Sequence, residues 1–372
     1  MLHILIIILL LVIISLLVYI AFFKKSDCMK STQPVKSLRA VSSGETININ
    51  GLDGKPKKWI LMVKLGSGGT NCKGTSAYSC HFLYADNENQ NLKHVTEFYV
   101  DSENSKNPAY QLYQLCINNN FVSWNDGGGK SCSGTSGWAH DKGIVAYNNT
   151  QGVYCQHSNP NWGNFNTGFT DSGEAGHSGL ETSLAQHMLF VKLSSKDDID
   201  NIVSLMNQAN VCLLDGSIDG FEACIKSKNC PDGYLTKQIG GLTMIAKPKG
   251  EKGDDAWSEL SNMQCNSDGM QVWSFCTPHC PLGNDGSLEP INNIRDVSND
   301  PYNEKSDLNT NCGMDFSEFG SNHCKIGTCD ANNKVIIGGN NHSTPSQGPR
   351  GGIFVVIDSV KLSEDFKCLF GK

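Results

Sequence analysis

Sixteen cysteines in a chain of 372 residues restrict the compartment in which this protein can fold. The number is even, and persistent disulfides form where the environment is oxidising. We expect most of the cysteines to form structural disulfides, in a pairing that their spacing does not define. A zinc site would use Cys276, His279 and Cys280, but "CTPHC" has no C-x-x-C pair and no matching second pair follows. We therefore expect no metal.

The first apolar stretch predicts a membrane anchor. Leu2–Phe23 contains no charged side chain and is followed by Lys24 and Lys25. A run of this length spans a bilayer as a helix, and it lacks the positive start of a cleaved signal peptide. The two lysines alone would favour a cytosolic domain, but the cysteines outweigh them, because long domains cross membranes largely regardless of flanking charge. We expect a transmembrane anchor or signal-anchor at residues 1–25 and a polar stalk at 26–50.

Glycosylation sequons and net charge refine the expected location and partners. The sequons begin at Asn148 and Asn341, which suits a lysosomal, secretory or extracellular ectodomain. The net charge of −7 argues against a broad basic surface for nucleic acid. A few well-placed lysines and arginines are nevertheless enough to bind phosphates locally.

Apolar runs and helical patterns alternate along the ectodomain, which predicts a mixed α/β (α+β) fold. We expect helices at "PAYQLYQLCINNN", "KDDIDNIVSLMNQAN" and "DDAWSELSNMQC". We expect strands at "WILMVKL", "CHFLYADN", "KGIVAYNN", "QGVYCQHS", "SLAQHMLFVKLSS", "LTMIAKP", "GMQVWSFC", "NKVIIGG" and "GGIFVVIDSVKL". Residues 281–322 are rich in Asn, Asp, Gly, Ser and Pro and predict a long loop.

Two glycine-containing segments do not predict a function. Lys64–Gly74 lacks the G-K-[ST] ending of a phosphate-binding loop and the helix that would follow it, so it is interpreted as a hairpin loop. Gly176–Leu180 lacks the second glycine of a nucleophile elbow at the required position.

Two His-x-Lys pairs carry the strongest chemical signal. His140 and Lys142 precede one apolar run, and His323 and Lys325 precede another. Residues two apart on a strand point to the same face, so the two side chains of each pair can reach one phosphate. One such pair arises easily by chance, whereas two that each lead into a strand indicate a site.

The ordered set of segments around these pairs resembles the type II (acid, lysosomal) deoxyribonucleases, a divergent branch of the phospholipase D superfamily. The resemblance extends from about Asp53 to Phe366. It is carried by "DGKPKKWILMVKL", "SWNDGGG", "GWAHDKGIVAYNNTQGVYCQHSNPNW", "AQHMLFVKLSS", "AKPKGEKGDDAWSEL", "NHCKIGTCD" and "GGNNHSTPSQGPRGGIF". Cys324, inside the second pair, departs from the family pattern, and a retained anchor is unusual for such enzymes.

The resemblance implies a phospholipase D-like pseudo-two-fold sandwich. Residues 51–215 and 216–372 would each give one His-x-Lys motif to a single central site. The implied activity is that of a metal-independent acid endodeoxyribonuclease, which needs no cofactor and acts on DNA through a phosphohistidine intermediate to give 3′-phosphate products. The apolar N-terminal stretch, and not the resemblance, predicts that this enzyme is bound to the membrane, and its oligomeric state, monomer or homodimer, stays open.

Each motif residue has an expected role in that reaction. We assign His140 as the nucleophile and His323 as the general acid, although the sequence is nearly symmetric on this point. Lys142 and Lys325 would hold the nonbridging oxygens and neutralise the charge that grows on them.

Four more residues are candidates for substrate binding, each with a structural alternative. Asn340 or Asn341 would donate to phosphate, or form part of a turn. Asp330 would orient a histidine, or be a loop carboxylate. His157 would bind phosphate as a secondary group, or be a buried structural histidine.

Two other functions remain open on the sequence alone. One is a related phosphodiesterase that acts on a phospholipid or on RNA. The other is a catalytically inactive structural or surface protein on the same scaffold, although such a role gives no reason for two pairs of cationic side chains.

Overall fold

The computed structural model describes thirteen stretches of a unit that extends from Ser43 to Lys372. They are residues 46–65, 82–95, 106–126, 138–159, 162, 184–222, 232–250, 255–266, 269–274, 294–296, 312, 321–342 and 350–370. The expected anchor at residues 1–25 and most of the expected loop at 281–322 lie outside them. No helix in the described stretches is long and apolar enough to cross a bilayer.

The first sheet contains the hairpin that the sequence predicts. β5 (Gly143–Tyr147) and β6 (Gly152–His157) pair in antiparallel register. Within the described residues the strand order is β3-β2-β1-β7-β6-β5-β4-β8, and the two-residue β13 pairs with β7. The remaining bounds are Trp59–Lys64 for β1, Phe82–Asp86 for β2, Lys93–Val95 for β3, Asn120–Trp124 for β4, Leu184–Leu193 for β7, Leu213–Gly216 for β8 and Ser321–Asn322 for β13.

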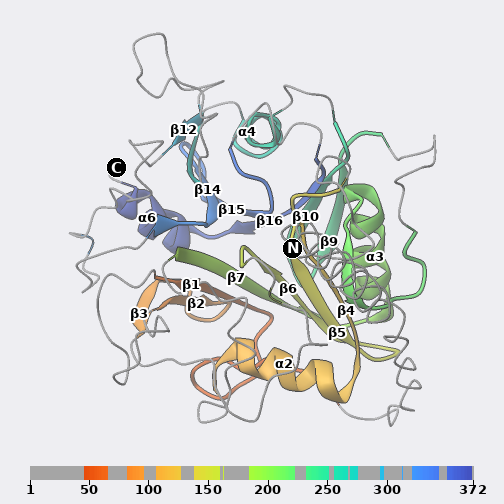
Figure 1. Cartoon of the computed structure of the whole chain (residues 1–372). Helices are drawn as coiled ribbons and strands as arrows, with labels where there is room; N and C mark the ends of the chain where they lie inside the picture. Colours follow the sequence, from red (N-terminus) through yellow and green to blue (C-terminus); the bar gives the residue numbers. More distant parts are fainter. Residues whose placement is uncertain are drawn as a thin grey trace, which may run out of the picture. The chain divides into compact units, whose positions relative to one another are not determined.

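The second sheet is formed mainly by the C-terminal part of the chain. Among the described strands its order is β12-β11-β14-β15-β16-β10-β9 (Figure 1). The bounds are Leu235–Ile239 for β9, Leu242–Lys247 for β10, Met270–Ser274 for β11, Ile294–Asp296 for β12, Lys325–Cys329 for β14, Lys334–Gly338 for β15 and Gly352–Asp358 for β16.

The two sheets share one pattern of strand order. The series β1-β7-β6-β5-β4 in the first sheet corresponds to β10-β16-β15-β14-β11 in the second, and every neighbouring pair in both series is antiparallel. In chain order each series begins with one strand, continues through a helix to the other four, and ends in another helix. The first His-x-Lys pair precedes β5 and the second precedes and begins β14, which are corresponding strands.

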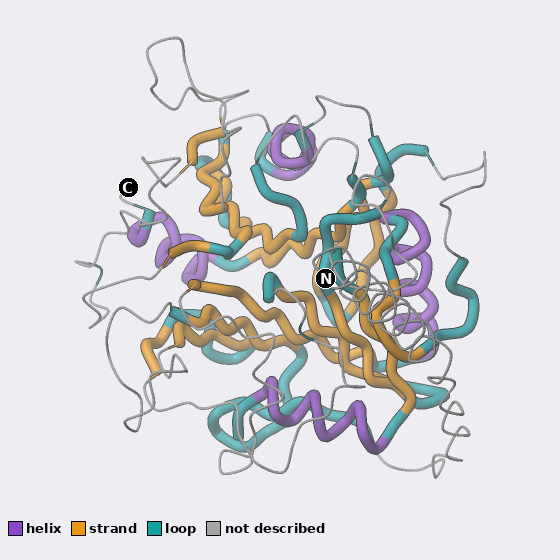
Figure 2. The backbone as a smooth tube through the Cα atoms, viewed as in Figure 1, coloured by secondary structure: helices purple, strands orange, loops and turns teal. Residues whose placement is uncertain are grey.

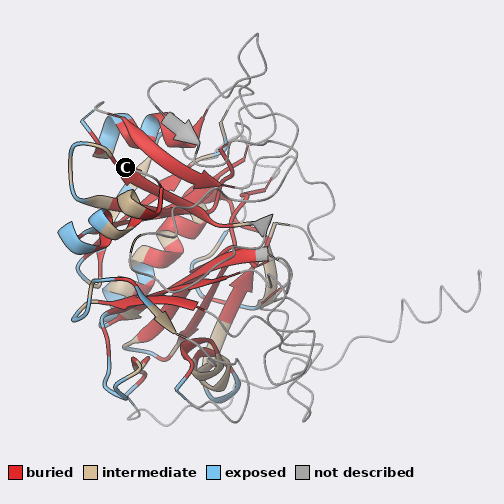
Figure 3. Cartoon of the chain, turned by 90° about the vertical axis from the view of Figure 1, so that its left-hand side faces the viewer, coloured by how far each residue is buried: buried red, intermediate tan, exposed pale blue. Residues whose placement is uncertain are grey.

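Side chains from both sheets form one shared core between them. β1 shows the arrangement, because Leu61 and Val63 face this core while Ile60 and Met62 face the opposite side, as strand alternation requires. Helix α2 (Pro108–Asn118) covers the outer face of the first sheet, and α4 (Ala256–Gln264) covers that of the second. Figure 2 shows these two helices on opposite outer sides of the strands. Figure 3 shows that the central strands are buried, whereas the edge strands β3, β8 and β9 are partly exposed.

Three of the four described helices were predicted and are confirmed: α2, α4 and α3 (Lys196–Ala209). Each begins at a capping side chain. Asn107, Ser195 and Asp255 accept hydrogen bonds from backbone N–H groups of the first turns of α2, α3 and α4, which would otherwise lack partners.

The prediction that "GGIFVVIDSVKL" forms a strand throughout is wrong at its end. The strand stops at Asp358, and Val360–Leu369 forms helix α6. Ser359 caps this helix by accepting from the Leu362 N–H at 3.1 Å. Leu362 and Phe366 are buried at helical spacing in the shared core, and Val360 is the one β-branched residue of the segment, so its own pattern is that of an amphipathic helix.

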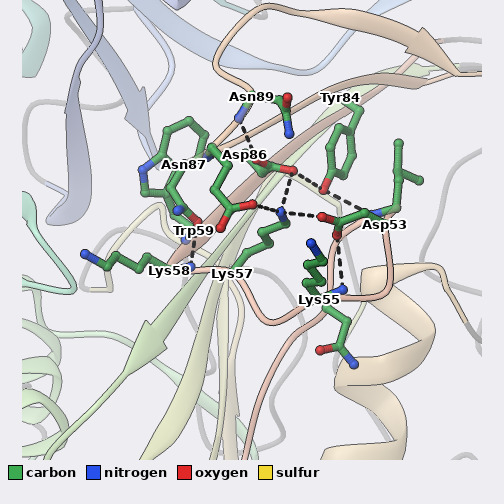
Figure 4. Close-up of polar contacts among 12 residues, drawn as sticks. Asp53, Lys55, Lys57, Lys58, Trp59, Tyr84, Asp86, Asn87 and Asn89 are labelled. Carbon is green, nitrogen blue, oxygen red and sulfur yellow. Dashed lines mark hydrogen bonds and ion pairs between the residues drawn. The ribbon is translucent and has the colours of Figure 1, made fainter.

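The folded body begins before the predicted end of the stalk. Ile47 and Ile49 are buried in the cluster beneath α2, so at least residues 46–50 belong to the body. Lys57 anchors the following turn, with its ammonium 2.9 Å from Asp53 and 3.7 Å from Asp86 (Figure 4). A third carboxylate, that of Glu88, lies 2.5 Å from it.

Disulfides are present, as expected. Cys265 is bonded to Cys329 and Cys312 to Cys368. The first joins the end of α4 to β14, and the second attaches a distant segment to α6. These bonds agree with an oxidising compartment. Cys116 and Cys155, by contrast, are buried thiols, so the expectation of structural disulfides does not extend to every cysteine.

Candidate active site

The fold brings the two His-x-Lys pairs into one electrostatic cluster. Burial, Lys325 and Lys142 lower the pKa of His323 to about 2, and Lys325 is among the cations that lower the pKa of His140. Each histidine is therefore close enough to a lysine of the other motif to be influenced by its charge. The two pairs are more than 180 residues apart in sequence, and only the fold places them together.

A series of hydrogen bonds, two between backbone groups and one to the His187 side chain, connects the two motifs. The Lys142 carbonyl accepts from the His157 N–H at 3.1 Å, and the next residue, Ser158, donates its N–H to the His187 carbonyl at 3.1 Å. The His187 Nδ1 then accepts from the Lys325 N–H at 3.2 Å. This chain of hydrogen bonds fixes the start of β14 relative to the start of β5.

The ring of His140 is held from both sides. Its Nδ1 lies 2.8 Å from the Gly339 carbonyl oxygen, and because a carbonyl only accepts, this nitrogen carries a proton. Its Nε2 lies 3.1 Å from Asp126 Oδ2. Gly339 lies at the end of β15, so the second half of the chain fixes the tautomer of the first histidine.

Asp126 lies at the centre of the cations. Its Oδ1 is 2.6 Å from Lys142 Nζ, and its Oδ2 is 3.7 Å from a guanidinium nitrogen of Arg350. Burial by itself raises the pKa of this carboxyl, but Lys142, His140 and Arg350 more than offset that effect and lower it well below its usual range. Asp126 is therefore ionised at every pH at which the protein is expected to work.

Arg350 fastens the second half to the loop that carries the first motif. Its Nε donates to the Trp138 carbonyl at 3.2 Å, and one terminal nitrogen donates to the Ala139 carbonyl at 3.3 Å. These bonds hold the residues just before His140 in place.

Asp141, inside the first motif, is a buried carboxylate that points away from Asp126 into a cage of donors. Its Oδ2 accepts from Trp124 Nε1 at 2.7 Å, and its Oδ1 accepts from the Ile353 N–H at 3.3 Å and from Gln156 Nε2 at 3.4 Å. Burial is nevertheless the stronger influence and raises the pKa of Asp141 to about 6.

Lys325 is also strongly perturbed. Burial and the nearby charge of Lys142 lower its pKa to about 7. Its ammonium donates to the His323 carbonyl at 2.8 Å, which ties the two residues of the second motif together. The Lys325 side chain is thus fully charged in acid and loses its charge near neutral pH.

The sequence matches the family described as Deoxyribonuclease II over residues 49–372. The chain belongs to the deoxyribonuclease II family. This match includes both His-x-Lys pairs and every residue of the site described above.

Two further comparisons add little to the family assignment. No curated protein matches the chain. Among solved structures, a phosphatidylserine synthase from Haemophilus influenzae Rd KW20 is similar at 13% identity and a TM-score of 0.31, over 72% of this chain and 68% of that one. A similarity this low supports no conclusion about the site.

Two of the predicted substrate-binding residues of this deoxyribonuclease II family member, Asn340 and Asn341, are buried next to Gly339. Asn340 is buried, donates from Nδ2 to the Arg350 carbonyl at 3.4 Å and accepts at its own carbonyl from Trp257. Asn341 is also buried, and its Oδ1 has no hydrogen-bond partner among the described residues. Both lie directly after Gly339, so a role in binding phosphate stays a prediction.

His157 and Asp330 are the other two predicted substrate-binding residues. His157 is buried edge-on against Trp162, with ring centroids 4.7 Å apart, and burial followed by Lys142 lowers its pKa. Asp330 follows the far end of β14, roughly 16 Å along the strand from Lys325 at about 3.3 Å per residue. This position suits the loop carboxylate that the sequence left open as the alternative, and the orienting role stays a prediction.

The sequon at Asn341 does not suit a folded glycoprotein. Its side chain is 6% exposed, which leaves no room for an attached glycan. Asn148 closes the β5–β6 turn, where its Oδ1 accepts from the N–H groups of Thr150 and Gln151.

The sequence reasoning missed Asp126, Gly339, Arg350 and His187 as residues of the site. Asp126 had a signal, since "SWNDGGG" was recognised as a family segment immediately before the first motif. Gly339 acts through its backbone carbonyl, and His187 is a buried histidine in the middle of an apolar strand. Neither of these two has a local pattern that reveals its role.

Proposed function

We propose that this chain is a metal-independent acid endodeoxyribonuclease that hydrolyses DNA phosphodiester bonds. The proposal rests on the proximity of both His-x-Lys pairs in a chain of the deoxyribonuclease II family. The pairs influence each other's pKa values, and a series of hydrogen bonds through His187 connects them. Cationic side chains replace the electrostatic role that a metal ion has in many nucleases.

The matching strand orders support a pseudo-two-fold sandwich for the two halves of the chain. In each half the motif stands at the start of the corresponding strand, β5 or β14. An approximate two-fold relation brings equivalent ends together and so presents two histidines and two lysines to one phosphate.

The first chemical step would be attack by His140. Its Nδ1–H bond to the Gly339 carbonyl leaves Nε2 as the nitrogen that can attack phosphorus. A P–N bond forms as the P–O bond to the 5′-oxygen breaks, and protonated His323 gives its proton to that leaving oxygen. The product of this step is a phosphohistidine bearing the 3′-nucleotide.

The second step would hydrolyse this intermediate. His323, now neutral, takes a proton from water as the water oxygen bonds to phosphorus. The P–N bond breaks, His140 is regenerated and a DNA end with a 3′-phosphate leaves. Lys142 and Lys325 neutralise the nonbridging oxygens in both transition states.

Acid pH suits this site for two reasons. Lys325, with a pKa of about 7, is fully charged near pH 5 and about half neutral at pH 7. Burial and the two lysines depress the pKa of His323, which keeps its ring neutral beside them. A bound phosphodiester neutralises those lysines, which raises the pKa of His323, and acid then completes its protonation.

Other parts of the proposal concern partners and location. We place the enzyme in a lysosomal, secretory or extracellular compartment, bound to the membrane by its N-terminal segment, as a monomer or a homodimer. Asn340, Asn341 and His157 are proposed to assist phosphate binding.

The test is cleavage of plasmid DNA by the disulfide-bonded protein at pH 5 in the presence of EDTA. We expect activity in the wild type and its loss in His140→Ala and His323→Ala. His94→Ala, in β3, serves as the matched control. Loss of activity with EDTA, or full activity in either motif variant, would refute the mechanism.

The same assay run on RNA and on phosphatidylcholine separates the related functions. Preferential turnover of either would replace DNA as the substrate. Binding of DNA without turnover of any of the three would indicate an inactive relative.

A further inference from the structure

The carboxylate of Asp126 has the contacts that a phosphate group would need in this site. One oxygen contacts Lys142 Nζ at 2.6 Å, and the other contacts His140 Nε2 at 3.1 Å. The guanidinium of Arg350 is 3.7 Å from that second oxygen. A phosphodiester presents its two nonbridging oxygens to cations in a similar way.

In this state His140 has no nitrogen available for phosphorus. Nδ1 donates to the Gly339 carbonyl, and Nε2 faces Asp126. Two anions cannot share Nε2 and Lys142 at contact distance without strong repulsion. One of the two partners of the ring must therefore leave before substrate reaches it.

Asp126 is the partner that can leave. The Gly339 carbonyl belongs to a backbone fixed by its own N–H, which donates to the Ile353 carbonyl at 3.1 Å. The Asp126 carboxylate, by contrast, lies on a short side chain that rotates about two bonds, while the Asp126 backbone carbonyl accepts from Arg350 at 3.4 Å. Its side chain is 17% exposed, against 10% for His140 and 3% for Lys142, so it is on the solvent side of both.

We propose that Asp126 occupies the position of the scissile phosphate and that DNA binds by displacing it, with uptake of a proton by the displaced carboxylate in acid. This inference rests on the proposed function, because it takes the ligand to be a phosphodiester. In this proposal His140, Lys142 and Arg350 form the phosphate subsite. The Asp126 carboxylate competes with the phosphate for these three side chains.

The surrounding charges explain why the exchange depends on pH. Three cationic or titratable side chains face the Asp126 carboxylate. They are His140 and Lys142, from the segment before β5, and Arg350, before β16. Lys325 and His323, at β14, are near enough to influence it electrostatically. Once the phosphate takes these cations, the displaced carboxylate lies beside an anion, which raises its pKa and favours protonation.

Asp126→Asn tests the proposal, because the amide keeps the shape and removes the competing charge. The probe is dimethyl phosphate, a diester whose charge is constant between pH 5 and 7, and its Kd is measured by calorimetry. For the wild type we expect Kd to rise as pH increases over this range, by at most about tenfold per pH unit for one proton. For the variant we expect a Kd at pH 7 at least about tenfold lower than that of the wild type, and a smaller difference at pH 5.

Asp358→Asn is the matched control, since this residue is exposed at the end of β16. It should reproduce the wild-type Kd at both pH values. Asp126→Ser provides a second removal of charge, and thermal unfolding of each variant verifies that it is folded.

An unchanged Kd in folded Asp126→Asn and Asp126→Ser would overturn the proposal. So would a large fall in kcat with unchanged KM and Kd, which would make Asp126 a residue that positions His140 for attack. Because the probe is not cleaved, the binding result is independent of the nuclease assay. Failure of the proposed function would appear there instead, as a wild type that does not cleave DNA.

Discussion

Replacing Asp141 by asparagine should change how the stability of this protein depends on pH. Asp141 is buried beside His140, where Trp124, Gln156 and the Ile353 N–H donate to it. These donors favour the ionised form, but desolvation outweighs them and raises the pKa of the carboxyl to about 6.

The sign of the effect follows from this direction. The folded state holds its proton up to about pH 6, whereas the unfolded chain releases it near the ordinary value of 3.8. The carboxyl therefore stabilises the fold relative to neutral pH when the pH is low, and this contribution is lost as pH rises from about 4 to 6. Two pKa units at about 1.36 kcal/mol each amount to roughly 3 kcal/mol of unfolding free energy.

Urea denaturation of the wild type and of Asp141→Asn, at half-unit steps from pH 4 to 7 with disulfides intact, measures this term. Buried histidines act in the opposite sense. Burial lowers the pKa of His157 and of His187, so their contribution is present above about pH 6.5 and is lost as pH falls. The difference between the two proteins isolates Asp141, because both contain the same histidines.

We expect the wild type to lose about 3 kcal/mol relative to the variant between pH 4 and 6.5, and the difference to be constant above that. The amide brings an N–H group close to other donors, which costs about 1–2 kcal/mol at every pH and shifts the curve without changing its slope. Parallel curves for the two proteins across this range would refute the reasoning, because Asp141 would then titrate alike in the folded and unfolded states.

Three further perturbations have definite expected outcomes. Gly339→Ala should reduce kcat on plasmid DNA by about 100-fold, since the new Cβ would clash with Asp141 Oδ1 and lie 2.8 Å from the His140 carbonyl oxygen, which displaces both residues. Lys57→Met should lower the unfolding free energy in urea by about 2–3 kcal/mol, because it leaves the buried Asp86 carboxylate without its cation. Removal of the Cys312–Cys368 disulfide by serine substitution frees a loop of 56 residues and should cost about 4 kcal/mol, seen as a lower Tm.

Each of these has its own check. Gly54→Ala, at a turn where nothing lies within 4 Å but φ is +75°, should lower stability through backbone strain and leave kcat unchanged, and a wild-type kcat in Gly339→Ala would contradict the crowding argument. Lys58→Met, at the exposed neighbour of Lys57, should leave stability nearly unchanged, and an equal loss in both would show that burial is not the cause. An unaltered Tm in the disulfide variant would mean that the bond does not restrict the unfolded chain.

Local signals in the sequence were enough to predict the elements that depend on neighbouring residues alone. Alternation of apolar residues around a short polar turn specifies the β5–β6 hairpin, and the capped amphipathic pattern of Lys196–Ala209 specifies α3. The two His-x-Lys pairs are visible for the same reason, because each needs only three consecutive residues. The family resemblance then identified the four motif residues as one group.

The contacts that complete the site around those four residues depend on the packing of the two sheets. The Gly339 carbonyl meets the His140 ring across 199 residues of sequence, and Arg350 reaches the backbone of Asp126 across 224. A backbone carbonyl has no signal in the sequence, because every residue has one. An ion pair between distant residues forms only when the sheets have packed. Helix α6 shows the same limit, since the helical spacing of Leu362 and Phe366 becomes decisive only when the shared core buries both side chains.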